Sequence, residues 1–179
     1  MASLTRAHTA ELDKRALSEI RAFLEEAFAD DLTAEDWDHT IGGVHVLARD
    51  EGALVGHASV VQRRLVVDGV GLRTGYVEAV AVRSDHRRRG IGNEVMASAE
   101  DVVRASYDLG ALSASEPGAR LYERRGWRRW IGPTWTLSPD GPVRTVDEDG
   151  SVFVLPTPTS PPLDQTSPIA CDWRPGDVW

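Results

Sequence analysis

A short apolar strand that runs directly into an arginine- and glycine-rich turn constrains this chain more than any other feature. The run 76–82 has the alternation of a strand, and Arg87-Arg88-Arg89-Gly90-Ile91-Gly92 follows it at the start of a predicted helix over 91–107. A helix N-terminus presents free backbone N–H groups and the positive end of the helix dipole, a combination that binds pyrophosphate. Glycines at 90 and 92 let the backbone approach phosphates without a Cβ in the way. The sequence therefore predicts an anion-binding loop over Arg87–Asn93.

The spacing Arg87-x-x-Gly90-x-Gly92 is not sufficient alone, because strands, arginine clusters and helix caps also occur in proteins that bind no nucleotide. A second segment, Gly118-Ala119-Arg120-Leu121-Tyr122-Glu123-Arg124-Arg125-Gly126-Trp127, strengthens the interpretation. The two segments, in this order, resemble the coenzyme A loop and the A-x-x-L-Y-x-x-x-G-[FW] signature of the GCN5-related N-acetyltransferase (GNAT) superfamily. The resemblance implies that the strand before the loop carries an acyl thioester and that the tyrosine lies near its sulfur.

The order of predicted elements supports an α/β fold. Helices are expected at 9–28, 33–39, 91–107 and 116–125, and strands at 44–49, 54–67, 70–82, 110–115 and 152–155. The strand at 152–155 is expected to be the last strand of the chain. A capping box over Thr33–Asp36 and a hairpin dipeptide, Asp68-Gly69, mark two of the boundaries. With the resemblance, this order implies the GNAT acyl-CoA N-acyltransferase fold, in which helices flank a mixed central sheet that is splayed at the cofactor site.

Length and proline content predict the domain organisation. A chain of 179 residues suits one domain with its own core. Five of the thirteen residues 156–168 are proline, so this segment is expected to join neither a sheet nor a helix. We predict an acetyltransferase domain over 1–155 and a proline-rich strap with a C-terminal tail over 156–179 that packs back on it.

Composition excludes several classes of function. A net charge of −8 argues against broad binding of nucleic acid, which needs a basic surface. No window approaches the ~20 apolar residues of a membrane span, and no secretory signal is present, so a cytoplasmic protein is expected. A single cysteine, Cys171, and histidines without metal-ligand spacing predict no disulfide and no metal site.

Longer stretches are similar to a narrower family, the aminoglycoside 2′-N-acetyltransferases. They include Asp-Trp-Asp-His-Thr-Ile-Gly-Gly at 36–43, Gly-Tyr-Val-Glu-Ala-Val-Ala-Val at 75–82, Asp-Gly-Ser-Val-Phe-Val-Leu-Pro at 149–156 and the terminal Cys-Asp-Trp-Arg-Pro-Gly-Asp-Val-Trp. The resemblance implies a homodimer that moves an acetyl group from acetyl-CoA to the 2′-amine of a cationic aminoglycoside by direct attack, without an acetyl-enzyme. Glu148 departs from the family, since an aspartate is expected there.

Two residues are predicted to be catalytic. Glu78 on the strand would take a proton from the acceptor ammonium, directly or through water. The alternative interpretation of Glu78 is a structural one, an edge-strand glutamate paired with an arginine such as Arg73. Tyr122 would donate its phenolic proton to the departing thiolate, and its alternative is a tyrosine packed in the core.

The remaining site residues fall into two groups. Those expected to bind acetyl-CoA are Val80, Ala81, Val82, Arg87, Arg88, Arg89, Gly90, Ile91, Gly92 and Asn93. Those expected to bind the cationic acceptor are Asp31, Asp36, Glu78, Ser113, Glu148, Asp177 and the C-terminal carboxylate of Trp179. Taken singly, each acid is also explained as solvated surface, Asp36 as a capping residue and Ser113 as a turn cap.

Three functions remain open at this stage. The first is an aminoglycoside acetyltransferase that confers resistance. The second is a related N-acetyltransferase of a cell-wall amino sugar or a polyamine, which an acidic cleft would also suit. The third is a non-catalytic acyl-CoA-binding module, against which the presence of both Glu78 and Tyr122 argues.

Overall fold

The computed structural model describes residues 2–29 and 31–179, with Pro117 described through its backbone alone. The chain divides into two compact units. Unit 1 comprises Met1–Val61 and Val77–Val102, and unit 2 comprises Gln62–Tyr76 and Val103–Trp179. The division falls within three elements, the strands β3 (Ala53–Val67) and β4 (Val70–Val82) and the helix α3 (Ile91–Ser106).

The strands of unit 1 form an antiparallel sheet. The strand β1 (Ser3–His8) pairs with β2 (Val44–Asp50), and β2 pairs with the first half of β3. The register between β2 and β3 shifts at Ala48/Arg49, where Ala48 pairs with Gly56. The last residues of β4 also belong to this unit.

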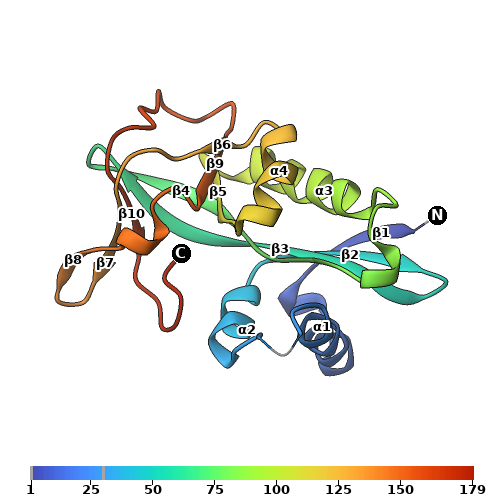
Figure 1. The fold of residues 1–179 in the computed structure, drawn as a ribbon. Coiled ribbons are helices and arrows are strands. Elements are labelled where there is room, and N and C mark those ends of the chain that lie inside the picture. Colours follow the sequence, from blue (N-terminus) through green and yellow to red (C-terminus); the bar gives the residue numbers. More distant parts are fainter. Residues whose placement is uncertain (1, 30) are drawn as a thin grey trace. The chain divides into compact units, whose positions relative to one another are not determined.

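Helices cover both faces of this sheet (Figure 1). On one face, α1 (Lys14–Ala27) buries Ile20, Phe23 and Leu24 in a cluster that also holds Leu47 and Leu54. The short helix α2 (Ala34–Thr40) lies beside α1. On the other face, α3 approaches so closely that a Cβ on Gly56 would lie 2.8 Å from Ile91 Cγ2. Two 3₁₀ turns complete the unit, η1 (Thr9–Glu11) and η2 (Ser84–His86).

Unit 2 contains a mixed sheet with the strand order β6-β9-β5-β4-β3-β10-β7-β8. Its further strands are β5 (Leu109–Ser113), β6 (Arg128–Arg129), β7 (Thr134–Ser138), β8 (Gly141–Arg144), β9 (Val152–Pro156) and β10 (Ile169–Asp172). Two of the pairings are parallel, β4 with β5 and β10 with β7. The helix α4 (Glu116–Arg124) and the turn η3 (Val146–Glu148) connect the strands.

Local turn and cap chemistry follows the prediction. Asp68 and Gly69 both have positive φ, 50° and 77°, as a two-residue hairpin turn requires. Thr33 and Asp36 form the reciprocal capping box at α2. Gly126, with φ 87°, follows the last residues of α4.

Three predictions about the elements are wrong. The first helix begins at Lys14 and not at Thr9, because the 3₁₀ turn η1 and the N-cap residue Asp13 precede it. The N-terminal strand β1 was not expected, because most of its residues are exposed and its stability comes from pairing with the distant β2. The strand at 152–155 is not the last, since β10 follows the proline-rich segment.

The strap between β9 and β10 forms neither helix nor strand over 157–168, as its prolines predict, but the prediction is wrong for Pro156, which ends β9 and pairs with Leu109. The strap is nevertheless fixed to unit 2. Thr157 Oγ1 donates to the carbonyls of Tyr107 and Asp108, and Trp130 Nε1 donates to Ser167 O at 2.9 Å. A Cβ on Gly132 would lie 2.0 Å from Ser167 O, so the strap requires glycine there. The division at residue 155 stays a prediction.

Among the helices of the described residues, none is both long enough and apolar enough to cross a membrane.

Candidate functional site

The predicted anion loop opens α3, a helix of sixteen residues whose N-terminal part, Ile91 to Val102, belongs to unit 1. The Glu94 N–H donates to Gly90 O at 3.1 Å, which is the first intrahelical bond. The N–H groups of Ile91, Gly92 and Asn93 precede that bond and therefore have no acceptor within the helix. The geometry that the sequence predicted for pyrophosphate is thus present in the backbone.

The two loop glycines differ in whether the backbone conformation requires glycine. Gly90 has φ +88°, a conformation that L side chains rarely adopt, while a Cβ there would meet nothing within 4 Å. Gly92 has ordinary helical geometry, and its Cβ would make a normal contact of 3.5 Å with Val82 Cγ2. Within the protein itself, therefore, only Gly90 is required by conformation.

Side chains around the loop are partly engaged with each other. Arg83 donates to both carboxylate oxygens of Asp85, at 2.8 and 3.3 Å. His86 lies between Asp85, at 2.6 Å, and Asp50, at 3.3 Å. The Arg83 and His86 bonds lower the pKa of Asp85 to about 2. Arg88 and Arg89 are exposed, and these side chains can reach an anion outside the loop.

Glu78 lies half-buried on β4, directly before an irregular residue. Ala79 has φ 49°, which is left-handed and uncommon for alanine in a strand. Its carbonyl accepts a hydrogen bond from His57 Nδ1 at 2.9 Å. In unit 2, Arg73, which the sequence analysis gave as an alternative partner of Glu78, donates to Asp108 through its side chain and its backbone N–H.

His57 and His45 form a buried pair in unit 1 that sequence analysis treated as structural or exposed. His45 Nδ1 and His57 Nε2 are 3.0 Å apart, and both side chains are fully buried. Burial lowers the pKa of His45 to about 4, with a further contribution from the charge of His8. Burial also lowers the pKa of His57 to about 3, partly opposed by its bond to Ala79 O.

This pair predicts acid sensitivity in a defined pH window. Both histidines are neutral in the folded protein but bind protons below pH 6.5 when unfolded. The unfolded state then binds more protons, so stability falls as the pH falls from 6.5 towards 4, by up to about tenfold in the folding equilibrium constant per pH unit for each histidine. The carboxyl groups of Asp85 and Asp149 have lowered pKa values, and they lose their contribution to stability only as the pH falls below about 4. Denaturant midpoints at pH 7.5, 6.5 and 5.0 test this, and equal midpoints would contradict it.

Tyr122 lies on α4 in unit 2. Its ring is edge-on to Trp127, with centroids 6.1 Å apart, and tilted against Phe153 at 6.2 Å. Burial raises the pKa of Tyr122 to about 12. The phenol therefore keeps its proton throughout the neutral range and can act as a donor. Both the core role and the functional role proposed from sequence are compatible with this packing.

The structure brings together two of the predicted acceptor-binding residues in unit 2. Ser113 Oγ, at the end of β5, donates to Glu148 Oε2 at 3.3 Å. Ser151, which sequence analysis did not select, donates to the same oxygen at 2.7 Å. Glu148 is thus a half-buried carboxylate held by two hydroxyl groups. Ser151 lies within the stretch 149–156 that resembles the narrower family, and its place three residues after Glu148 could have indicated it.

The C-terminal tail folds around Arg174, also in unit 2. Arg174 Nη2 donates to Trp179 O at 3.0 Å and Nε donates to Asp177 O at 2.8 Å, while its guanidinium lies 5.5 Å from the Tyr76 ring centroid. The Trp179 ring is buried, and its Nε1 donates to Thr145 Oγ1 at 2.9 Å. The Trp173 ring, in contrast, is 48% exposed. One oxygen of the C-terminal residue is therefore engaged with Arg174.

The two predicted acceptor ligands from the N-terminal region belong to unit 1. Asp31 is exposed. Asp36 Oδ2 accepts from the N–H and the hydroxyl of Thr33, at 2.9 and 2.8 Å, so this carboxylate serves the helix cap. Any role of either residue towards a substrate stays a prediction.

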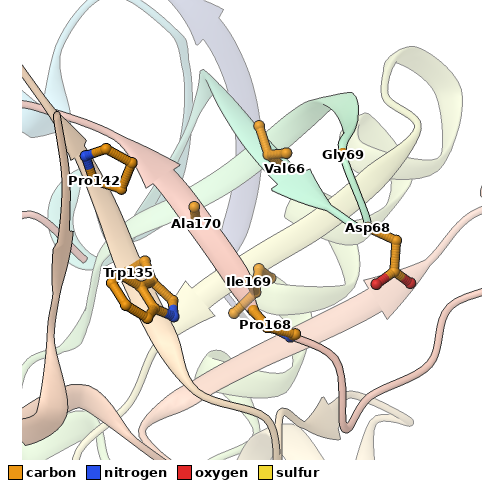
Figure 2. Close-up of a pocket in the computed structure, with 8 residues that line it drawn as sticks. All are labelled: Val66, Asp68, Gly69, Trp135, Pro142, Pro168, Ile169 and Ala170. Atoms are coloured by element: carbon orange, nitrogen blue, oxygen red, sulfur yellow. The ribbon is translucent and has the colours of Figure 1, made fainter.

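An open pocket of about 420 Å³ lies on the β3, β10, β7 and β8 part of unit 2 (Figure 2). Its walls are mainly apolar and include Val66, Trp135, Pro142 and Ala170. None of the predicted site residues lines it. Asp68 also lines it and no cationic side chain does, so its chemistry does not suit a pyrophosphate.

The sequence of this chain is similar to those of known proteins. The family described as Acetyltransferase (GNAT) domain matches residues 8–130. An aminoglycoside 2′-N-acetyltransferase from Mycolicibacterium fortuitum is 48% identical over 174 residues, which cover 96% of this chain and 89% of that protein.

Solved structures agree on the fold. The GNAT family N-acetyltransferase YhbS from Escherichia coli, in complex with CoA, has a TM-score of 0.65 at 15% identity, covering 97% of this chain and 89% of that one. A GNAT family acetyltransferase from Brucella melitensis, in complex with acetyl-CoA, has a TM-score of 0.59 at 14% identity, with coverage of 90% and 92%. The α/β fold expected from sequence is thereby confirmed, and the chain belongs to the GNAT family of acetyltransferases.

Proposed function

We propose that this protein transfers the acetyl group of acetyl-CoA to the 2′-amine of aminoglycoside antibiotics and so confers resistance to them. The observation that carries the proposal is the 48% identity, over nearly the whole chain, to a protein named for that reaction. Two GNAT neighbours that were solved with CoA and acetyl-CoA support the choice of donor.

The donor is assigned to the end of β4 and the loop before α3. The free N–H groups of Ile91, Gly92 and Asn93 would receive the pyrophosphate at the positive end of the helix dipole. Exposed Arg88 and Arg89 would add charge-assisted hydrogen bonds to the phosphates. Val80, Ala81 and Val82 would hold the acyl-bearing arm along the strand.

In the reaction itself, Glu78 takes a proton from the acceptor ammonium, which frees the nitrogen lone pair. The amine attacks the thioester carbonyl carbon directly, and a C–N bond forms in a tetrahedral intermediate. The nitrogen then loses its second proton to solvent, and the C–S bond breaks as the carbonyl re-forms. Tyr122, which keeps its proton at neutral pH, donates to the leaving thiolate. The acceptor is cationic, and the carboxylates Asp31, Asp36, Glu148 and Asp177, with the C-terminal carboxylate and the Ser113 hydroxyl, are proposed to bind it.

The proposed regiochemistry is tested by exchanging acceptors in an assay of thiol release. Tobramycin carries a 2′-amine, whereas kanamycin A carries a hydroxyl at that position, so rapid acetylation is expected for tobramycin alone. Mass spectrometry and NMR of the product identify the modified amine. Fast turnover of kanamycin A, or of a polyamine in preference to tobramycin, would contradict the proposal and favour the broader N-acetyltransferase.

The donor assignment predicts a selective effect of Gly92→Ala. The new methyl group makes only an ordinary contact with Val82, and alanine favours a helix by up to about 1 kcal/mol over glycine, so the melting temperature should stay equal or rise. A phosphate that approaches the backbone would nevertheless meet the methyl group, and the KM for acetyl-CoA is expected to rise about tenfold while the KM for tobramycin changes little.

The matched control is Gly71→Ala, at a strand position where an added Cβ meets nothing within 4 Å. It should leave both KM values unchanged. If Gly92→Ala behaves like this control, the backbone at Gly92 does not approach the cofactor.

A further inference from the structure

A line of hydrogen bonds in unit 1 connects the start of β2 to the irregular residue of β4. Gly42 N–H donates to Thr9 Oγ1 at 2.9 Å in an exposed bond, and Thr9 Oγ1 lies 2.9 Å from His45 Nε2. His45 Nδ1 lies 3.0 Å from His57 Nε2, and His57 Nδ1 lies 2.9 Å from Ala79 O. Both imidazoles are buried, so water does not compete for the bond between them.

Only one arrangement of protons satisfies the bonds of both rings while the rings stay neutral. A carbonyl oxygen accepts and cannot donate, so His57 must carry its proton on Nδ1. His57 Nε2 is then an acceptor, and His45 must donate to it from Nδ1. His45 Nε2 becomes an acceptor in turn, and its donor is the Thr9 hydroxyl, whose other acceptor, Gly43 O, lies farther away at 3.2 Å. All the bonds therefore run in one direction, towards Ala79, and bonds aligned in this way strengthen one another.

The end of this line is a strained position. A left-handed alanine costs roughly 1–2 kcal/mol relative to its ordinary conformation, and such residues persist where the surroundings hold them. The bond from His57 diverts the Ala79 carbonyl to a side chain. Because the Ala79–Val80 peptide is planar and trans, fixing its C=O also fixes its N–H in the opposite direction.

We propose that His57, oriented by His45 and Thr9, is a positioning residue for acetyl transfer. The line of bonds holds the left-handed turn at Ala79 and thereby sets the directions of the Val80 N–H and of the neighbouring Glu78 side chain. The Val80 N–H belongs to the strand segment assigned to the acyl donor, and Glu78 is the assigned base. The inference therefore rests on the proposed function. The histidines act through the backbone and do not touch the reacting atoms.

The proton arrangement is tested without any assay of activity. Long-range ¹H–¹⁵N NMR spectra of the ¹⁵N-histidine-labelled protein at pH 7.5 distinguish the two neutral tautomers of each ring. Both His45 and His57 are expected to be neutral with the proton on Nδ1. A His57 that carries its proton on Nε2, or that is charged, would overturn the inference whatever substrate the enzyme uses.

The positioning role is tested by two variants that differ in one hydrogen-bond donor. His57→Asn keeps an N–H group at the place of Nδ1, whereas His57→Leu puts a methyl group there. The leucine variant is expected to lose about 10- to 100-fold in kcat, with the KM for acetyl-CoA within about threefold, and the asparagine variant to recover most of the loss. Equal kcat in folded leucine and asparagine variants would show that the bond to Ala79 does not position the site.

A milder pair covers the case in which His57→Leu does not fold. Thr9→Val removes the hydroxyl at the rim of the line, and Thr9→Ser keeps it. We expect the valine variant to keep the Nδ1–H tautomer of His45, because His57 Nε2 still requires that donor, with a kcat lowered about threefold. The serine variant should match the wild type in both. A His45 in Thr9→Val that carries its proton on Nε2 would overturn the inferred direction of the bonds, and an unchanged kcat in that variant would overturn the role of Thr9, while failure of the wild type to acetylate tobramycin would contradict only the proposed function.

Discussion

Replacement of Glu78 by glutamine is expected to lower kcat/KM for tobramycin by about 10²- to 10⁴-fold, the range over which a positioned general base commonly contributes. The substitution keeps the size and most hydrogen bonds of the side chain but removes its ability to accept a proton. Since the base must be ionised to act, the activity that remains should also lose the acidic limb that Glu78 imposes on the pH profile. The melting temperature should change little, because the side chain is only half-buried.

The matched control for charge is Glu51→Gln, at an exposed turn of the same unit. It removes one carboxylate without touching β4 and should leave kcat/KM unchanged. A fall in Glu78→Gln no larger than in this control, with the acidic limb intact, would assign the base to another group or to water.

Replacement of Tyr122 by phenylalanine is expected to lower kcat by about 10²-fold with little change in either KM. The ring packing against Trp127 and Phe153 does not need the hydroxyl, so the variant should fold normally. Because burial holds the pKa of Tyr122 near 12, the wild-type profile should show no titration of this group between pH 6 and about pH 10. Rapid-quench measurements of a single turnover separate thiolate departure from product release.

Tyr107→Phe supplies the control for loss of a phenol in the same unit. Burial also raises the pKa of Tyr107, and its ring lies against Gly75, but it is outside the assigned machinery. Its kinetics should equal those of the wild type. If both tyrosine variants keep full kcat, Tyr122 is a core residue and the thiolate needs no protein acid.

Elements with local signals were predictable from sequence. The capping box at Thr33, the hairpin at Asp68-Gly69 and the helix end at Gly126 each depend on residues within a few positions of each other, and all three are found in the structure. The loop that opens α3 follows the same rule, since its glycine spacing and the preceding strand are adjacent in the chain. These signals fix backbone conformation before any tertiary contact is made.

Elements stabilised by distant partners were not predictable. β1 has few buried residues and exists through its register with β2, in which Ser3 pairs with Arg49. The alternating apolar residues around Ala79 do not indicate its left-handed conformation. The hydrogen-bond donor to its carbonyl is His57, which lies 22 positions away. Ser113, which also bonds Glu148, is likewise 35 positions away from it in the chain.

The position of β10 has a consequence for the order in which unit 2 is made. β10 lies between β3 and β7, antiparallel to the first and parallel to the second, so the β7–β8 hairpin joins the rest of the sheet only through it. On the ribosome, β3 and β7 each wait with an unpaired edge until residues 169–172 have emerged, and such edges are templates for aggregation. A chain that ends within the strap would therefore have two open sheet edges. Chaperones should be needed most while the strap is being synthesised.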